Sequence, residues 1–259
     1  MRFRPCIDIH NGKVKQIVGL SLDDNNGASV AEENYVSDRG ADYYADLYRQ
    51  HKLNGGHIIL LNKKGTKEYE QDLVQAKEAL KAYPGGMQIG GGVDASNAEQ
   101  MLDMGASHVI VTSAVFKDGN INYENLKNIS YVTGKERLVL DLSCRLTGDD
   151  YYIMTDRWQK FTDERLSIGL MIHIGKYCDE FLVHAVDVEG CAEGIERDVV
   201  RLLGESNNIK ATYAGGINSL EDIEELELLG NGKVDFTVGS ALDLFGGSLS
   251  FEELAKRYE

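Results

Sequence analysis

The chain carries one pattern of glycines and small polar residues twice, once in each half. The first copy has Gly91-Gly92-Val93 followed by Thr112-Ser113-Ala114, and the second has Gly215-Gly216-Ile217 followed by Gly239-Ser240-Ala241. In both copies a helix-like stretch and a short apolar stretch separate the two turns, and the spacing from glycine to serine is similar. We therefore expect a fold built from two equivalent halves.

Each half also places an aspartate inside a short apolar stretch well before its glycines. Ile7-Asp8-Ile9 lies near the start of the chain, and Leu140-Asp141-Leu142 lies near its middle. An ionised carboxylate is unfavourable in apolar surroundings unless it has partners. The repeat thus predicts two β4α4 half-barrels, each with one aspartate at the end of its first strand.

Short apolar stretches alternate with helix-like stretches along the whole chain. We expect strands at residues 3–9, 57–61, 87–89, 108–111, 138–142, 181–185, 211–213 and 236–238. We expect helices at residues 35–53, 67–83, 96–104, 123–131, 163–177, 193–203, 219–229 and 251–257. Eight such units predict one (β/α)8 TIM barrel domain of the α/β class, covering residues 1–259. An open doubly wound sheet is the alternative, but it is typical of fewer units and a single glycine-rich turn.

The charge and the cysteines limit the partners and the compartment. The formal net charge is -15, which disfavours nucleic acid and anionic membranes as partners. No apolar stretch is long enough to span a membrane, and no signal peptide opens the chain. Cys6 and Cys144 lie in or beside apolar strands, and no Cys-x-x-Cys pair occurs. We expect a reduced, cytoplasmic monomer with buried thiols.

The repeated turns are suited to phosphate groups. In a barrel of this kind the active site lies at the carboxyl ends of the strands, where the turns of both copies fall. Glycine lets the backbone approach a phosphate closely, and the following helix N-terminus contributes oriented N–H donors. A single turn of this kind would more simply be a tight loop, but two copies in register favour a small-molecule substrate with two phosphates. The predicted phosphate sites are Gly91, Gly92, Thr112 and Ser113 on one side and Gly215, Gly216, Gly239 and Ser240 on the other.

Asp8 and Asp141 are the predicted catalytic residues. Two carboxyl groups that face one substrate can act as acid and base when their surroundings separate their pKa values. For either residue alone, a structural aspartate that accepts loop N–H bonds is a serious alternative. No cofactor motif and no metal-ligand spacing accompanies the pair, so we expect neither a cofactor nor a metal. His57 and His184 occupy equivalent second strands and could touch the substrate, although packed core histidines are the simpler interpretation.

Four segments of the chain are specific when they are taken together. They are Pro5-Cys6-Ile7-Asp8-Ile9-His10-Asn11-Gly12-Lys13-Val14, Gln88-Ile89-Gly90-Gly91-Gly92-Val93, Ala214-Gly215-Gly216-Ile217 and Val238-Gly239-Ser240-Ala241. In these segments the chain resembles the phosphoribosylformimino-aminoimidazole-carboxamide ribotide isomerases of histidine biosynthesis. The resemblance covers nearly the whole chain. It is closest to the branch typical of eukaryotes, through segments such as Asp141-Leu142-Ser143-Cys144-Arg145 and Ala185-Val186-Asp187-Val188-Glu189-Gly190.

The resemblance implies an activity and roles for individual residues. The reaction would be an Amadori rearrangement, in which a bis-phosphorylated aminoaldose becomes an aminoketose. Asp141 would be the general acid that assists opening of the ribose ring, and Asp8 the general base that moves the C2 proton. Trp158 resembles the loop tryptophan that stacks on the substrate base, with a simple packing tryptophan as the alternative.

Three positions depart from the commoner bacterial pattern of this family. Ala185 stands where those relatives have a threonine that assists catalysis, so that role is vacant or passes to a neighbour such as Asp187. Gln16 stands in place of an arginine, and Leu60 in place of an aspartate. Substrate contacts at these positions therefore do not carry over from those relatives.

Two other functions fit many of the same features. The cyclase subunit of imidazole glycerol phosphate synthase shares the repeat, both aspartates and the phosphate sites, but it works with a glutaminase and uses ammonia. Ala214-Gly215-Gly216-Ile217-Asn218 and the segment 34–53 favour the isomerase. The other alternative is a phosphosugar-binding barrel without catalysis, which the two strand-end aspartates disfavour. Conversion of the aminoaldose without ammonia would distinguish the isomerase from the cyclase.

Overall fold

The computed structural model describes residues 1–17, 33–191, 194–206 and 209–259. Within these residues, eight parallel strands form the centre of the molecule and pair with one another in chain order. Apolar, β-branched residues fill most of their positions, as expected for strands that are covered on both faces. The strands are β1 (Cys6–His10), β4 (Gly56–Leu60), β5 (Met87–Gly90), β6 (Val109–Val111), β9 (Leu138–Asp141), β13 (Glu180–His184), β14 (Lys210–Ala214) and β15 (Asp235–Phe236).

The last strand returns to the segment that leads into the first. Phe3 and Phe236 form a parallel bridge. The N–H of Arg4 donates to the carbonyl oxygen of Phe236 at 2.8 Å, and the N–H of Phe236 donates to the carbonyl oxygen of Arg2 at 3.1 Å. The sheet is therefore closed, so the predicted barrel is confirmed and the open doubly wound sheet was the wrong alternative.

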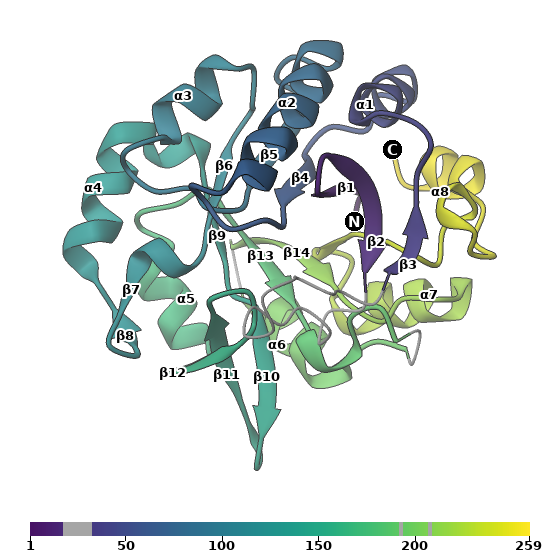
Figure 1. Cartoon of the computed structure of the whole chain (residues 1–259). Coiled ribbons are helices and arrows are strands. Elements are labelled where there is room, and N and C mark those ends of the chain that lie inside the picture. The colour runs from purple at the N-terminus through teal and green to yellow at the C-terminus, as the bar shows by residue number, and fades with distance from the viewer. Residues whose placement is uncertain (18–32, 192–193, 207–208) are drawn as a thin grey trace.

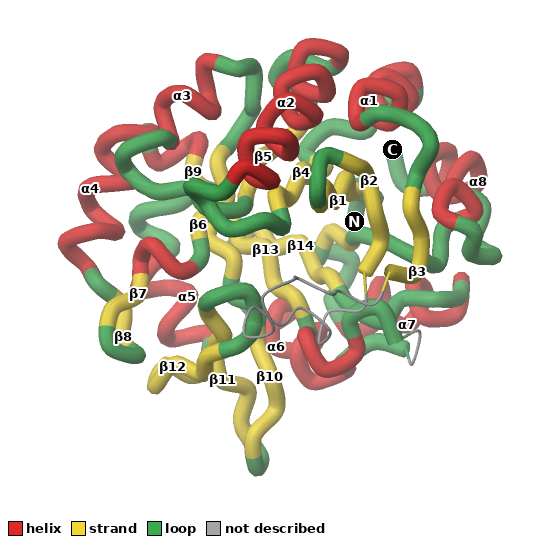
Figure 2. The backbone as a smooth tube through the Cα atoms, viewed as in Figure 1, coloured by secondary structure: helices red, strands yellow, loops and turns green. Residues whose placement is uncertain are grey.

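Helices surround the barrel and follow one another around it in chain order (Figure 1; Figure 2). Each carries buried apolar residues on the side that faces the sheet, which is typical of amphipathic helices on a parallel sheet. None of the helices in the described part of the chain is long and apolar enough to cross a membrane. Their bounds are α1 (Ala41–Gln50), α2 (Lys67–Ala82), α3 (Ala98–Asp103), α4 (Tyr123–Thr133), α5 (Ile168–Ile174), α6 (Arg197–Glu205), α7 (Leu220–Leu229) and α8 (Phe251–Arg257).

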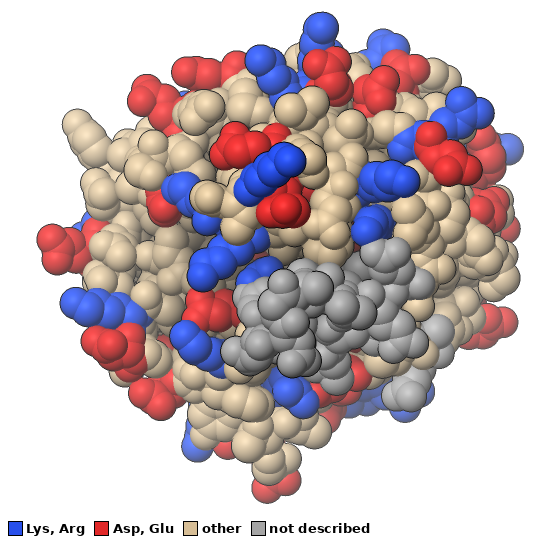
Figure 3. All heavy atoms as spheres, viewed as in Figure 1, with Lys and Arg blue, Asp and Glu red and all other residues tan. Residues whose placement is uncertain are grey.

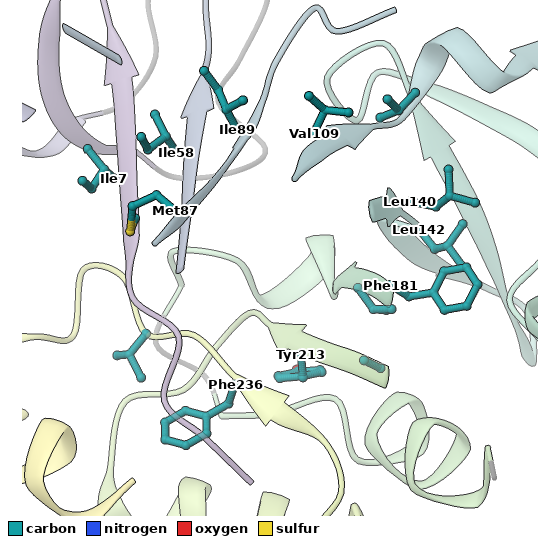
Figure 4. Close-up of a cluster of buried hydrophobic side chains, with 14 of the residues drawn as sticks. Ile7, Ile58, Met87, Ile89, Val109, Leu140, Leu142, Phe181, Tyr213 and Phe236 are labelled. Atoms are coloured by element: carbon teal, nitrogen blue, oxygen red, sulfur yellow. The ribbon is translucent and has the colours of Figure 1, made fainter. Parts of the chain in front are cut away.

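The two faces of the barrel strands have different environments. Side chains such as Ile7, Ile58 and Ile89 belong to the large core between strands and helices, part of which is drawn in Figure 4. Ile110 and Val139 belong instead to a small cluster with Leu182 and Ala214, built from four neighbouring strands. Burying one such side chain fully stabilises the fold by about 1.5–3 kcal/mol. Because successive residues of a strand alternate between faces, Asp8 and Asp141 lie on the inner face.

A buried ionic network fills the barrel at the amino ends of its strands. The Nε atom of Arg4 donates to Asp235 at 2.7 Å, and its Nη1 atom lies 3.0 Å from an oxygen of Glu180. Gln88 donates to the other oxygen of Glu180 at 2.6 Å. These side chains are almost completely buried, so Arg4 and Gln88, rather than water, stabilise the two carboxylates, and the half-exposed Arg2 supplies a second cation to Asp235 at 3.0 Å.

Two predicted helices were wrong in part, because edge strands take up some of their residues. The helix expected at residues 35–53 begins only at Ala41, since β3 (Glu33–Val36) pairs with β2 (Lys13–Ile17), which in turn pairs with β1. The helix expected at residues 163–177 begins at Ile168, since β12 (Lys160–Arg165) belongs to a small antiparallel sheet. The other strands of that sheet are β10 (Cys144–Thr147) and β11 (Asp150–Thr155).

Helix α6 begins at Arg197, whereas the prediction began at residue 193, which lies outside the described residues.

The remaining elements are short. A two-stranded sheet consists of β7 (Phe116–Lys117) and β8 (Asn120–Ile121). Single turns of 3-10 helix occur at Ser113–Val115, Lys135–Arg137, Val186–Val188 and Asp243–Phe245.

Candidate active site

A cavity of about 740 Å³ opens at the carboxyl ends of the barrel strands. This volume lies in the range of ligand pockets, and the position is where barrel enzymes carry their active sites. All of the site residues predicted from the sequence line this one cavity. They are Asp8, Gly91, Gly92, Thr112, Ser113, Asp141, Trp158, Gly215, Gly216, Gly239 and Ser240.

The two Gly-Gly turns have a backbone that other residues rarely adopt. Gly91 and Gly92 have φ angles of 93° and 65°, and Gly215 and Gly216 have φ angles of 122° and 72°. A Cβ atom at Gly91 would overlap the backbone of Leu60, and a Cβ atom at Gly216 would overlap the carbonyl oxygen of Gly194. Glycine is therefore required at both turns, and it exposes backbone to the cavity at both.

Asp8 lies in β1 and is partly buried at the cavity wall. The side-chain amide of Gln16 donates to its Oδ2 atom at 3.2 Å. Burial, together with the negative charge of Glu189, raises the pKa of Asp8 to about 7, although His184 and Gln16 both act to lower it. A carboxyl group with this pKa can accept and release a proton near neutral pH.

Asp141 ends β9, the fifth barrel strand, and accepts hydrogen bonds from three side chains. The hydroxyl of Ser143 donates to Oδ1 at 2.7 Å, and Nδ1 of His184 lies 3.3 Å from the same oxygen. The hydroxyl of Thr112 donates to Oδ2 at 3.3 Å. Burial alone would raise the pKa of Asp141, but the charge and hydrogen bond of His184 and the hydrogen bonds of Ser143 outweigh it. The pKa of Asp141 is consequently lowered, and its carboxyl group is ionised.

The two histidines that the sequence analysis treated as core residues both line the cavity. Burial would lower the pKa of His184, but Asp141 raises it to about 9, so His184 is protonated at neutral pH. Burial and the charge of His184 lower the pKa of His57 to about 3, so His57 is neutral. The simpler interpretation was therefore incomplete for His184. Strand alternation could have revealed it, because Leu182 pairs with Asp141 and His184 lies two residues further along the same face.

Trp158 lies in the turn between β11 and β12 and closes one side of the cavity. Its Nε1 atom donates to the hydroxyl of Ser143 at 2.9 Å. Its ring lies 5.7 Å from the ring of His184, and it packs against Leu61. The indole is thus partly buried and reaches Ser143 and His184, although the turn that carries it lies outside the barrel.

Comparison with known proteins identifies the family. The sequence matches the family model described as histidine biosynthesis protein over residues 2–249. The chain belongs to this family.

Similar members of the histidine biosynthesis protein family share one name. A relative from Medicago truncatula is 49% identical over 98% of this chain and 80% of its own length. One from Neurospora crassa is 45% identical over 95% of this chain and 93% of its own. One from Saccharomyces cerevisiae is 40% identical over 98% and 97%. Each is named as an imidazole-4-carboxamide isomerase whose substrate name contains two phosphoribosyl groups, and the Medicago protein is described as chloroplastic.

Asp187, a neighbour that could take over the role of the threonine hydroxyl missing at Ala185, is bonded elsewhere. One oxygen of Asp187 accepts from Nε of Arg145 at 2.8 Å, and the other accepts from the N–H of Leu146 at 2.9 Å. Asp187 is also not part of the cavity wall. The hydroxyls that contact Asp141 come instead from Ser143, in the loop after β9, and from Thr112, in the loop after the neighbouring strand β6.

The cations around the cavity were not found from the sequence. Lysine and arginine side chains gather around the middle of the face that carries the cavity (Figure 3), and those in its wall are Lys63, Lys64, Arg157 and Lys160. Lys64 extends from the loop after β4, where its Cβ lies close to Gly92, and its Nζ atom binds Asp94 at 2.7 Å. Scattered loop lysines have no sequence signal of their own, so only the folded chain assigns them to the site.

Metal ligands are not gathered in the part of the chain that the structure describes. Among the described residues, no group of three or more histidine, cysteine, aspartate or glutamate side chains could hold a metal ion.

Proposed function

We propose that this chain catalyses an Amadori rearrangement in histidine biosynthesis, with Asp8 and Asp141 as its acid–base pair. The substrate would be N-(5-phosphoribosyl)formimino-5-aminoimidazole-4-carboxamide ribotide, an aminoaldose, and the product the corresponding phosphoribulosyl aminoketose. Family membership and the shared isomerase name of the relatives support this activity. The observation that carries it is that one cavity contains two carboxyl groups with opposite pKa shifts between two glycine turns.

Asp8 is the proposed base. The rearrangement removes a proton from C2 of the opened sugar, which requires a group that is ionised but still basic near neutral pH. The pKa of about 7 meets this requirement, and it follows from burial and from Glu189. Gln16, which replaces the arginine of bacterial relatives, contributes an uncharged donor and so leaves Asp8 more basic than a cation would.

Asp141 and His184 together are the proposed acid. Ring opening requires a proton at the ribose ring oxygen, yet Asp141, whose pKa is lowered by His184 and Ser143, would rarely hold one by itself. His184 carries a proton at neutral pH and lies within hydrogen-bond distance of Asp141. We infer that Asp141 delivers its proton to the ring oxygen as it takes one from His184, because the two groups titrate as a coupled pair.

The two glycine turns are the proposed phosphate sites. Gly91 and Gly92 present their backbone together with Thr112 and Ser113, and Gly215 and Gly216 do so with Gly239 and Ser240. Lys64 and Arg157 line the cavity, and Lys64 lies beside the first of the two turns. That site would bind its phosphate partly through charge, and the other chiefly through backbone N–H groups. Trp158 would stack on the imidazole base.

The proposal also includes a cytoplasmic monomer. All four cysteines are free, and Cys6, Cys144 and Cys178 are buried, as in proteins of reducing compartments. Sedimentation of the purified chain at several concentrations would test the monomeric state. A mass that doubles with concentration would contradict it.

The decisive experiment supplies the aminoaldose to the purified chain alone. Formation of the aminoketose without ammonia or a glutaminase is the expected result, and spectroscopic or chromatographic separation of the two sugars would follow it. No conversion without ammonia, but formation of an imidazole product with it, would indicate the cyclase. Binding without any conversion would indicate a phosphosugar-binding barrel.

A further inference from the structure

The hydroxyl group of Ser143 connects Trp158 to Asp141. Ser143 is completely buried just after β9. Its oxygen lies 2.7 Å from Oδ1 of Asp141 and 2.9 Å from Nε1 of Trp158. The same oxygen is 3.5 Å from Nδ1 of His184. Ser143 therefore contacts the indole of the outer turn and both members of the proposed acid pair.

Chemistry decides the direction of this chain of hydrogen bonds. The indole N–H can only donate, and an ionised carboxylate can only accept. The single hydroxyl proton of Ser143 therefore points to Asp141, and a lone pair of the oxygen receives the N–H of Trp158. A donor that binds the oxygen polarises the hydroxyl and strengthens the bond that it donates in turn.

The turn that carries Trp158 has an unusual backbone. Asp156, Arg157 and Trp158 have φ angles of 51°, 56° and 66°, so three consecutive residues other than glycine are left-handed. Each such residue is strained, and such strain persists only where surrounding contacts hold it. Here the N–H of Asp156 donates to the hydroxyl of Ser113 at 2.9 Å, and Arg157 donates to the carbonyl oxygen of Leu61 at 3.3 Å. The turn is thus fastened to a predicted phosphate residue as well as to Ser143.

We propose that Ser143 is a positioning residue that links Trp158 to Asp141, so that the hydrogen bond from its hydroxyl to the carboxyl group is strongest while the indole occupies the cavity wall. The hydroxyl that Ala185 lacks is supplied from this position instead. Any substrate that moves the indole onto its base removes a donor from Ser143, and Asp141 then becomes a better proton carrier at the moment of binding. The link rests on the proposed function only for its effect on turnover.

Other titratable groups surround the pair and belong in the same test. His184 on β13, His57 on β4, Asp8 on β1 and Glu189 beyond β13 exert charge effects on Asp141 or on its partner His184, and Cys144 is affected by Asp141 in turn. None of these groups receives a hydrogen bond from Trp158 in the described residues. A change in the indole N–H alone therefore acts on Asp141 through Ser143.

The test is a double-variant cycle on the full chain, comprising the unaltered protein, Ser143→Ala, Trp158→Phe and the two together. Carboxyl carbon NMR of labelled aspartate follows the titration of Asp141, which is assigned with Asp141→Asn. Ser143→Ala removes only the hydroxyl, and we expect it to raise the midpoint for Asp141 by about one pH unit. Trp158→Phe keeps an aromatic ring without the N–H, and we expect a smaller rise that disappears when Ser143 is alanine.

Turnover gives the second measurement. We expect Ser143→Ala to lower kcat about tenfold with little change in KM, and Trp158→Phe to raise KM equally in both backgrounds. Ser206→Ala is the matched control, because it removes another buried serine hydroxyl, bonded to Leu203, far from the cavity wall. It should leave the Asp141 midpoint unchanged.

Two results would overturn the link. One is an unchanged Asp141 midpoint in Ser143→Ala, and the other is a shift by Trp158→Phe that is equally large with and without the hydroxyl. If Ser143→Ala does not fold, Ser143→Cys retains a weak donor, and its midpoint should still rise. The NMR titration needs no substrate, so a failure of the proposed isomerase activity would leave this test intact and would be recognised separately by absent turnover of the unaltered chain.

Discussion

Nδ1 of His184 lies 3.3 Å from Oδ1 of Asp141, and both side chains are about nine-tenths buried at the floor of the cavity. Asp141 was predicted from the sequence as a catalytic residue, whereas His184 was not. The raised pKa of His184 and the lowered pKa of Asp141 have the same origin, since each charge stabilises the other away from water. A proton is therefore retained beside Asp141 at neutral pH, where the proposed ring opening would use it.

This pairing predicts a bell-shaped dependence of kcat/KM on pH. Asp8 must be ionised to act as a base, so activity should rise with a midpoint near its pKa of about 7. The Asp141–His184 pair must keep its proton, so activity should fall with a midpoint near the pKa of His184, about 9. Initial rates at low substrate across pH 5–10 would measure both limbs. His184→Asn should displace the upper limb, and an upper limb that stays in place would exclude His184 as the proton source.

Replacing either carboxyl group should separate catalysis from binding. Asp8→Asn and Asp141→Asn keep the shape of the side chain but remove its ability to transfer protons. We expect each to lower kcat by about 10²–10⁴-fold, with product affinity, measured by calorimetry, changed only slightly. Turnover near the unaltered rate in either variant would contradict the assigned role of that residue.

The glycine turns should not tolerate even one additional methyl group. Gly91→Ala and Gly216→Ala each place a Cβ on a left-handed backbone and against a neighbouring backbone. We expect KM to rise at least tenfold and the free energy of unfolding to fall by about 1–3 kcal/mol. Gly148→Ala is the matched control, because Gly148 also has a positive φ of 63° but open space around its Cβ position. A rise in KM as large for Gly148→Ala would show that the effect is not specific to the cavity.

The ionic network below the cavity should contribute stability rather than activity. Arg4→Met leaves the buried Glu180 without its cation and Asp235 with only the half-exposed Arg2, so we expect urea denaturation to show a loss of about 3–5 kcal/mol. Kinetic constants of the folded fraction should remain close to those of the unaltered chain. Arg257 pairs with Glu224 at the surface, and Arg257→Met should leave the unfolding midpoint in place. A loss below about 1 kcal/mol for Arg4→Met would contradict a structural role for the network.

Sequence patterns predicted the barrel strands well and two helices poorly. Each barrel strand lies within a few residues of its expected position, because a buried apolar stretch followed by a helix is a local signal. Residues 35–36 of β3 and 163–165 of β12 were predicted as helix, but they belong to strands that pair with β2 and β11, outside the predicted helices. No local pattern at Tyr35 or Glu164 indicates that strand pairing.

The same contrast holds for the cavity. Asp8, Asp141 and the glycine turns could be named from the chain alone, because a carboxylate in an apolar strand and repeated glycines are exceptions to local rules. His184 could have been found from strand alternation, but Gln16 and Ser143 follow no such exception. Each is an ordinary residue whose importance comes from the group that it touches.

By itself the sequence determined the number of βα units, the two strand-end aspartates and the turns that only glycine can form, because each depends on residues that are neighbours in the chain. Tertiary structure alone decided which polar groups meet at Asp141. The hydroxyl of Ser143 comes from the loop that follows Asp141, the imidazole of His184 comes from β13, and the indole of Trp158 reaches Ser143 from the turn after β11. The contact between His184 and Asp141 depends on the register of the parallel strands β13 and β9, where a shift by one residue would turn His184 to the opposite face.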